Sequence, residues 1–177
     1  MSNFVASWEI PSSDGVHMVQ FEHGTTSGKR VICVDGKEIY KVDWMFKLVG
    51  DEYFTVGSAK CQLIINSRMP FIYEYSLKVN GKSLKKFREQ QSKILKSWTT
   101  NLNGTNVRII LEKNTLDVWV NGKVIKTENE FSEDGSKTHF QILSHDACIK
   151  TTSSGKRKVG LFQKLYIDNN EIPEATE

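Results

Sequence analysis

Residues 71–79, FIYEYSLKV, decide the fold class together with the Asn80-Gly81 dipeptide that follows them. Apolar or aromatic residues occupy every second position of this stretch, which indicates a strand with one buried face. An Asn-Gly dipeptide directly after such a run is typical of a tight β-hairpin, because both residues adopt positive φ at low cost. The face that we expect to be buried consists of Phe71, Tyr73, Tyr75, Leu77 and Val79.

The same two signals recur on both sides of this stretch. Residues 60–66 (KCQLIIN) and 106–113 (NVRIILEK) alternate in the same way, and Asp35-Gly36 and Asn121-Gly122 also follow strand-like runs. Residues 31–34 (VICV) are apolar on both faces, which is typical of a strand in the middle of a sandwich. The sequence therefore predicts an all-β fold in which short strands are joined by tight turns.

The chain contains an internal repeat. Residues 34–37 (VDGK) match residues 120–123 (VNGK) at an offset of 86 residues. Nearer the N-terminus, Ser7-Trp8 matches Ser97-Trp98 at an offset of 90, so the second copy lacks four residues that follow Glu22 in the first. A duplication of this kind predicts two domains of the same fold.

The tetrapeptide SGKR also occurs twice, at residues 27–30 and 154–157, but its flanking sequences do not match. It is not a phosphate-binding P-loop, because neither Ser nor Thr follows Gly28-Lys29 and no helix is expected there. We interpret both copies as exposed loops, in which Ser and Gly form the bend and Lys and Arg favour solubility. A basic loop can also bind a partner, and the candidate residues for this are Lys156, Arg157 and Lys158.

Residues 85–96, KKFREQQSKILK, differ from the rest of the chain because they lack alternation and are rich in helix formers. We interpret this segment as the connection between the two halves, with room for a short helical turn. The expected organisation is an N-terminal β-sandwich at residues 1–87, a linker at 88–96 and a C-terminal β-sandwich at 97–177. The four tryptophans, two in each half, should supply much of the buried area.

The composition argues against several classes of function. The chain has 24 basic and 21 acidic side chains, and a net charge of +3 is too small to predict a nucleic-acid partner. No run of apolar residues is long enough for a membrane span, and the N-terminal segment lacks the features of a signal peptide. Three cysteines without CxxC spacing predict no disulfide framework. We therefore expect a cytoplasmic protein without membrane insertion, and the oligomeric state stays open.

No group of residues has the spacing of a catalytic or metal site. The four histidines and three cysteines do not form the close pairs typical of zinc sites. His145 and Cys148 are three residues apart, which places them on opposite faces of a strand. The sequence therefore predicts a non-enzymatic protein that binds other proteins, with no catalytic residues, no cofactor and no metal. The alternative that stays open is a β-sandwich that binds a small molecule or a carbohydrate.

Several long segments resemble the Fas apoptotic inhibitory molecule family. They are SDGVHMVQFEHGTTSGKRVICVDGKEIYKVDWMFKLVG (13–50), FIYEYSLKVNGKSLKKF (71–87), LDVWVNGK (116–123) and EFSEDGSKTHFQI (130–142), with SSGKRKVG and LYIDNNEIPE near the C-terminus. The resemblance is collinear and covers nearly the whole chain. The N-terminal segment is similar to that of the family's short form.

This resemblance implies a function that the residues alone do not give. Members of the family have two β-sandwich domains built from related repeats, are cytosolic and carry no known catalytic residues. They are linked to inhibition of death-receptor (Fas) apoptosis, to neurite outgrowth signalling and to protection against protein aggregation under stress. The expected partners are therefore signalling components or misfolded client proteins.

Overall fold

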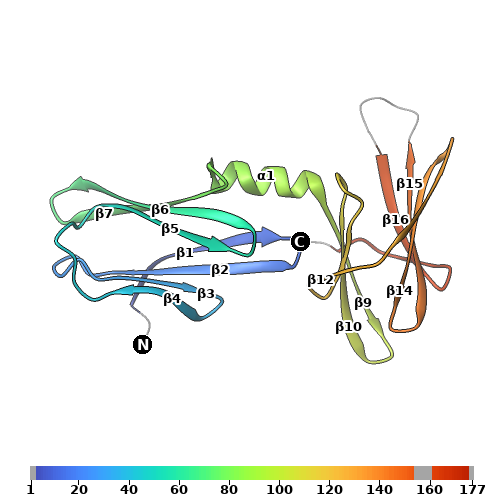
Figure 1. The fold of residues 1–177 in the computed structure, drawn as a ribbon, viewed down its shortest axis with the longest axis horizontal. Coiled ribbons are helices and arrows are strands. Elements are labelled where there is room, and N and C mark those ends of the chain that lie inside the picture. Colours follow the sequence, from blue (N-terminus) through green and yellow to red (C-terminus); the bar gives the residue numbers. More distant parts are fainter. Residues whose placement is uncertain (1–2, 154–160, 176–177) are drawn as a thin grey trace. The chain divides into compact units, whose positions relative to one another are not determined.

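A computed structural model describes residues 3–153 and 161–175, and these residues form an all-β fold (Figure 1). All strand pairs are antiparallel, and the strands form four separate sheets. One helix, α1 (Leu84–Ile94), lies among the described residues. It is too short and too polar to cross a membrane, and the described residues contain no other helix that could. The predicted fold class is therefore confirmed.

The first compact unit comprises residues 1–12 and 16–91. Its two four-stranded sheets are simple meanders, with strand orders β1-β2-β3-β4 and β5-β6-β7-β8. The strands are β1 (Phe4–Ser12), β2 (Gly15–His23), β3 (Arg30–Val34), β4 (Lys37–Val42), β5 (Gly50–Val56), β6 (Ala59–Met69), β7 (Ile72–Val79) and β8 (Lys82–Ser83).

The core of the first unit lies between its two sheets. Alternate residues of β2 and of β6 and β7 are fully buried, as the period-two pattern predicts. Phe87 of helix α1 also belongs to this core. The buried set contributed by the strands is Ile10, Val19, Phe21, Ile32, Val56, Ala59, Cys61, Leu63, Ile65, Leu77 and Val79.

The second compact unit comprises residues 13–15 and 92–177, and it repeats the plan of the first. Its sheets have strand orders β9-β10-β11-β12 and β13-β14-β15-β16-β17. The extra strand, β13, has no counterpart in the first unit. The strands are β9 (Leu95–Leu102), β10 (Thr105–Glu112), β11 (Val118–Val120), β12 (Lys123–Ile125), β13 (Glu128–Ser132), β14 (Gly135–Ile142), β15 (His145–Ser153), β16 (Leu161–Ile167) and β17 (Asn170–Ile172).

One turn recurs in all four sheets, where the last two strands of each sheet meet. Its first residue is Asp35, Asn80, Asn121 or Asp168, each with φ near 50°. In each turn the backbone N–H of this residue donates to a carbonyl on the strand that precedes these two. The side chains of the first three also accept a hydrogen bond from a backbone N–H of that strand, at 2.8–2.9 Å. The described residues thus form four related meanders, a finer repeat than the two halves predicted from the sequence.

Two expectations about burial are wrong. Phe71 does not share the buried face of β7, because it precedes the strand and is exposed. Trp44 is also exposed, whereas Trp98 is fully buried in the second core. The helix expected near the linker is confirmed, although α1 begins at Leu84, before residue 88. The domain limits at residues 87 and 97 stay a prediction.

Candidate functional site

The β2–β3 hairpin is longer than its counterpart in the second unit. Its residue pairs run from Val19 and Val34 out to His23 and Arg30. The β10–β11 hairpin starts at the equivalent pair but ends at Leu111 and Val118. The first hairpin therefore has two more residue pairs, Glu22 with Val31 and His23 with Arg30. The outermost of these pairs supplies the two most unusual buried side chains of the first unit.

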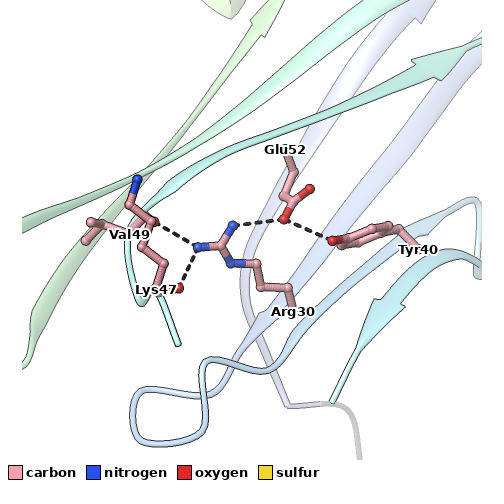
Figure 2. Close-up of polar contacts among 5 residues, drawn as sticks. All are labelled: Arg30, Tyr40, Lys47, Val49 and Glu52. Carbon is pink, nitrogen blue, oxygen red and sulfur yellow. Dashed lines mark hydrogen bonds and ion pairs between the residues drawn. The ribbon is translucent and has the colours of Figure 1, made fainter. Parts of the chain in front are cut away.

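Arg30 lies at the centre of a buried polar network (Figure 2). Its side chain is only 3% exposed, and its Nη1 donates to Glu52 Oε1 at 2.8 Å. Its Nη2 donates to the carbonyls of Lys47 and Val49, at 2.9 and 3.0 Å. The hydroxyl of Tyr40 also donates to Glu52 Oε1, at 3.1 Å. Because the guanidinium is paired and hydrogen-bonded, its burial is tolerated.

This network fixes the loop of residues 43–49 between β4 and β5. The backbone N–H of Met45 donates to the carbonyl of Ser27 at 2.9 Å, which ties this loop to the β2–β3 turn. Gly28, with φ of 73°, is required there because any side chain would collide with the Met45 carbonyl oxygen. The interpretation of the first SGKR as an exposed, solubilising loop is therefore wrong. Its Gly and Arg are buried for structural reasons.

His23 lies opposite Arg30 in the hairpin and is also buried. Its Nδ1 shares a hydrogen bond of 2.7 Å with the hydroxyl of Tyr75, and its ring packs edge-on against Tyr73. Burial lowers the pKa of His23, and the charge of Arg30 lowers it further, although the backbone of Leu48 opposes the shift. The imidazole is therefore held neutral, because a second cation beside Arg30 would be uncompensated.

The loop fixed by Arg30 presents two large apolar side chains to solvent. Trp44 is 66% exposed and Phe46 is 89% exposed, with their ring centroids 6.3 Å apart. The β6–β7 turn lies at the same end of the unit, because Tyr73 near that turn contacts His23. This turn exposes three further apolar side chains. We refer to Trp44, Phe46, Met69, Phe71 and Ile72 together as the apolar end.

Phe71 adopts a backbone conformation that is unfavourable for an aromatic residue. Its φ is 66°, a region that normally selects glycine, and its side chain is 82% exposed. Neither burial nor a local hydrogen bond explains why an aromatic residue occupies this position. Strain of this kind persists where function or the surrounding fold requires it. The apolar end is therefore the best candidate for a functional surface in the first unit.

Two sets of candidate residues were named from the sequence. Lys156, Arg157 and Lys158 lie outside the described residues. His145 and Cys148 do not form a nucleophile and base pair, since His145 Nδ1 bonds Asp168 Oδ2 at 2.6 Å. Burial raises the pKa of the Cys148 thiol, which disfavours the reactive thiolate. Among the residues described, no cluster of His, Cys, Asp and Glu could hold a metal ion.

Comparison with known proteins agrees with the resemblance seen in the sequence. A protein-family model described as Fas apoptotic inhibitory molecule (FAIM1) matches residues 4–175. The chain belongs to this family. It is 54% identical over 176 residues to the human protein named Fas apoptotic inhibitory molecule 1, covering 98% of both chains.

Relatives from other mammals give the same result. The protein of that name from Bos taurus is 55% identical over 179 residues, which is 100% of this chain and 89% of the bovine one. The protein from Mus musculus is 52% identical over 179 residues, covering 100% of both. The family assignment made from sequence segments is thus confirmed.

Proposed function

We propose that this protein is a non-enzymatic, cytosolic binding protein that inhibits death-receptor (Fas) apoptosis and keeps damaged proteins soluble. Membership of the Fas apoptotic inhibitory molecule family, and the names of its relatives, support the anti-apoptotic part. The observation that carries the binding part is the apolar end, where Trp44 and Phe46 are exposed on a loop fixed by Arg30.

The physical basis is the cost of leaving large apolar groups in water. Aromatic side chains contribute much of the energy of protein interfaces when a partner buries them. A loop that is already fixed loses little conformational entropy on binding, so more of that energy appears as affinity. In the first unit, the hydrogen bonds from Arg30 to Lys47 and Val49 supply this preorganisation. A misfolded client, which exposes apolar segments, is the kind of partner that such a surface fits.

The test is the light scattering of an aggregating client protein, with and without this protein at substoichiometric amounts. We expect suppression by the native protein and loss of suppression in Trp44→Ser/Phe46→Ser. The matched control is Val124→Ser/Phe131→Ser, which removes two exposed apolar side chains from the second unit. Equal loss in both variants, or in neither, would contradict a role for the apolar end.

The anti-apoptotic role needs a separate readout. Cells that express the native protein should survive a Fas agonist better than cells that express an unrelated cytosolic protein. If survival is unchanged while client suppression persists, the Fas-related part of the proposal is wrong and the solubilising part stands. Trp44→Ser/Phe46→Ser in the same assay reports whether both activities use one surface.

A small-molecule site remains the second candidate, because the second unit contains an open groove. The groove has a volume of about 410 Å³ and is lined by Thr99, Thr100, Asn106, Val107, Arg108 and Asn121. A few convergent polar groups of this kind can recognise a sugar or a small carboxylate. Calorimetry with monosaccharides and dicarboxylates would favour this candidate if binding saturates and is lost in Arg108→Gln.

A further inference from the structure

Three lysines lie side by side on the outer face of the β13–β17 sheet. Lys137 of β14 is directly opposite Lys150 of β15, which is directly opposite Lys164 of β16. All three side chains are exposed on the face away from the core, since the residues that flank them in the strands are buried or, at Ser136, half-buried. We refer to them as the lysine row. Adjacent strands are about 4.8 Å apart, so the row crosses roughly 10 Å of the sheet.

The other described residues neutralise the lysine row poorly. Lys137 makes no ion pair or hydrogen bond through its side chain to the described residues, because the nearby Glu130 bonds His139 instead. Lys150 lies over the ring of Tyr166, 4.6 Å from its centroid. Lys164 has an exposed contact of 3.8 Å with Glu171. Like charges directly opposite one another destabilise a sheet, so the row has a cost that its own contacts do not remove.

The fold itself does not require this row, as the first unit shows. Phe54, Cys61 and Val79 are aligned across β5, β6 and β7 as Phe140, Ala147 and Ile167 are across β14, β15 and β16. Each lysine of the row lies three residues along its strand from one of these aligned positions. The same step from the aligned positions of the first unit gives the counterparts of the lysine row. They are Asp51, Ile64 and Ser76, which also lie directly opposite one another. The same sheet position therefore carries no cationic row in the other half of the chain.

We propose that the lysine row binds a short acidic segment of a partner protein. In this segment, about three carboxylates lie together and basic or neutral residues flank them. The proposal concerns the second unit and is independent of the apolar end.

The charges that flank the row favour a peptide over a nucleic acid. Glu130 lies across from Lys137 on β13, and Glu171 lies beside Lys164 on β17. A continuous polyanion that crossed the sheet would meet these two carboxylates, whereas a peptide can place its acidic residues on the lysines alone. The lysine ammonium is also a flexible point charge, which can pair with carboxylates in several geometries. Phosphate recognition often uses the planar guanidinium of arginine instead.

The experiment measures binding of three labelled probes to the full chain by fluorescence anisotropy. The first probe is a peptide with three consecutive glutamates flanked by lysine and serine. The second has the same composition with the glutamates dispersed, and the third is a single-stranded oligonucleotide of equal negative charge. We expect the clustered peptide to bind most tightly and its affinity to fall as salt is raised.

The decisive variant is Lys137→Gln/Lys150→Gln/Lys164→Gln, and its control is Lys78→Gln/Lys123→Gln/Lys126→Gln, which removes the same net charge elsewhere. Removing the lysine row should weaken binding of the clustered peptide about tenfold or more, because three charge contacts are lost. The control should change the affinity less than about twofold. The melting temperature of the row variant should equal or exceed that of the native protein, because a repulsion has been removed.

Three results would overturn the proposal. Equal weakening in the control would show that only net charge matters. Tighter binding of the oligonucleotide than of the clustered peptide would assign the face to a nucleic acid. Destabilisation of the row variant, with peptide binding unchanged in its folded fraction, would show that the lysines support the sheet instead.

Discussion

The β2–β3 and β10–β11 hairpins follow the same plan but close their cores differently. At the offset of 86 residues, the positions of Arg30 and Glu52 correspond to Leu116 and Thr138 in the second half. Leu116 packs against the second core, and Thr138 is buried with its hydroxyl bonded to Asn129. In the first half, two extra residue pairs bring His23 and Arg30 to the same place and build a polar network.

The difference shows how a small change in hairpin length alters a surface. The second half closes its hairpin with an apolar side chain. The first half uses a guanidinium that reaches the carbonyls of Lys47 and Val49 and so fixes a loop that exposes Trp44 and Phe46. The same meander thus ends in a packed apolar side chain in the second unit and supports the exposed apolar end in the first.

The strongest destabilisation is expected when Arg30 is replaced by leucine, the residue at the corresponding position of the second half. Arg30→Leu should lower the free energy of unfolding by about 3 kcal/mol, because it leaves Glu52 largely buried without its cation. The matched control is Arg68→Leu, which breaks an exposed ion pair with Glu74 and should cost less than about 1 kcal/mol. Urea unfolding of both variants measures the difference.

The double variant Arg30→Leu/Glu52→Thr tests whether the residue pair of the second half can replace the ion pair of the first. It removes both charges and restores the pair of residues found in the second half, so it should recover about half or more of the stability lost in Arg30→Leu. Stability no higher than in the single variant would show that the two halves are not equivalent at this position.

A smaller effect is expected at the β6–β7 turn. Phe71→Gly should raise the free energy of unfolding by about 1 kcal/mol, because glycine adopts a φ of 66° without strain. The control is Tyr53→Gly, an exposed position in the regular strand β5, where glycine should lower stability by about 0.5–1 kcal/mol. Thermal unfolding should therefore shift in opposite directions, and a shift in the same direction would remove the argument for strain at Phe71.

The smallest effect is a pH dependence from a single group. The folded-state pKa of His23 lies below its ordinary value of 6.5, so the unfolded chain binds a proton first as the pH falls. Stability should therefore decrease as the pH is lowered through 6.5 and level off below the folded-state pKa. In His23→Gln this part of the decrease should be absent between pH 7 and 5. The lowered pKa of Asp35, which His17 causes first of all, acts only in more acidic solution.

Most of the fold was predictable from the sequence, because its signals are local. Alternation places Leu63 and Ile65 in the core, and the Asn-Gly dipeptide at residue 80 specifies its turn. The fourfold repeat was also predictable, since VNGK at residues 79–82 is identical to VNGK at 120–123. The signal for this repeat lies in the turn dipeptides and not only in the similarity of the two halves.

The candidate site was not predictable in the same way. Arg30 lies in a basic loop by composition, and the partner that explains its burial, Glu52, is 22 residues away in the chain. Trp44 was expected to supply buried area with the other tryptophans, because apolar residues usually lie in the core. Only the fixed conformation of its loop exposes it, together with Phe46. The burial of Arg30 and the exposure of this loop both depend on contacts between residues far apart in the chain. A local sequence pattern carries no information about such contacts.

If the apolar end of the first unit binds clients, a bound client must slow the exchange of its backbone amides. Amide hydrogen exchange of the native protein, with and without an aggregating client, measures this. We expect new protection at residues 43–49 and 69–72, and none of it in Trp44→Ser/Phe46→Ser. Client-induced protection that is confined to other residues, or that persists at these residues in the variant, would show that clients do not bind through these side chains.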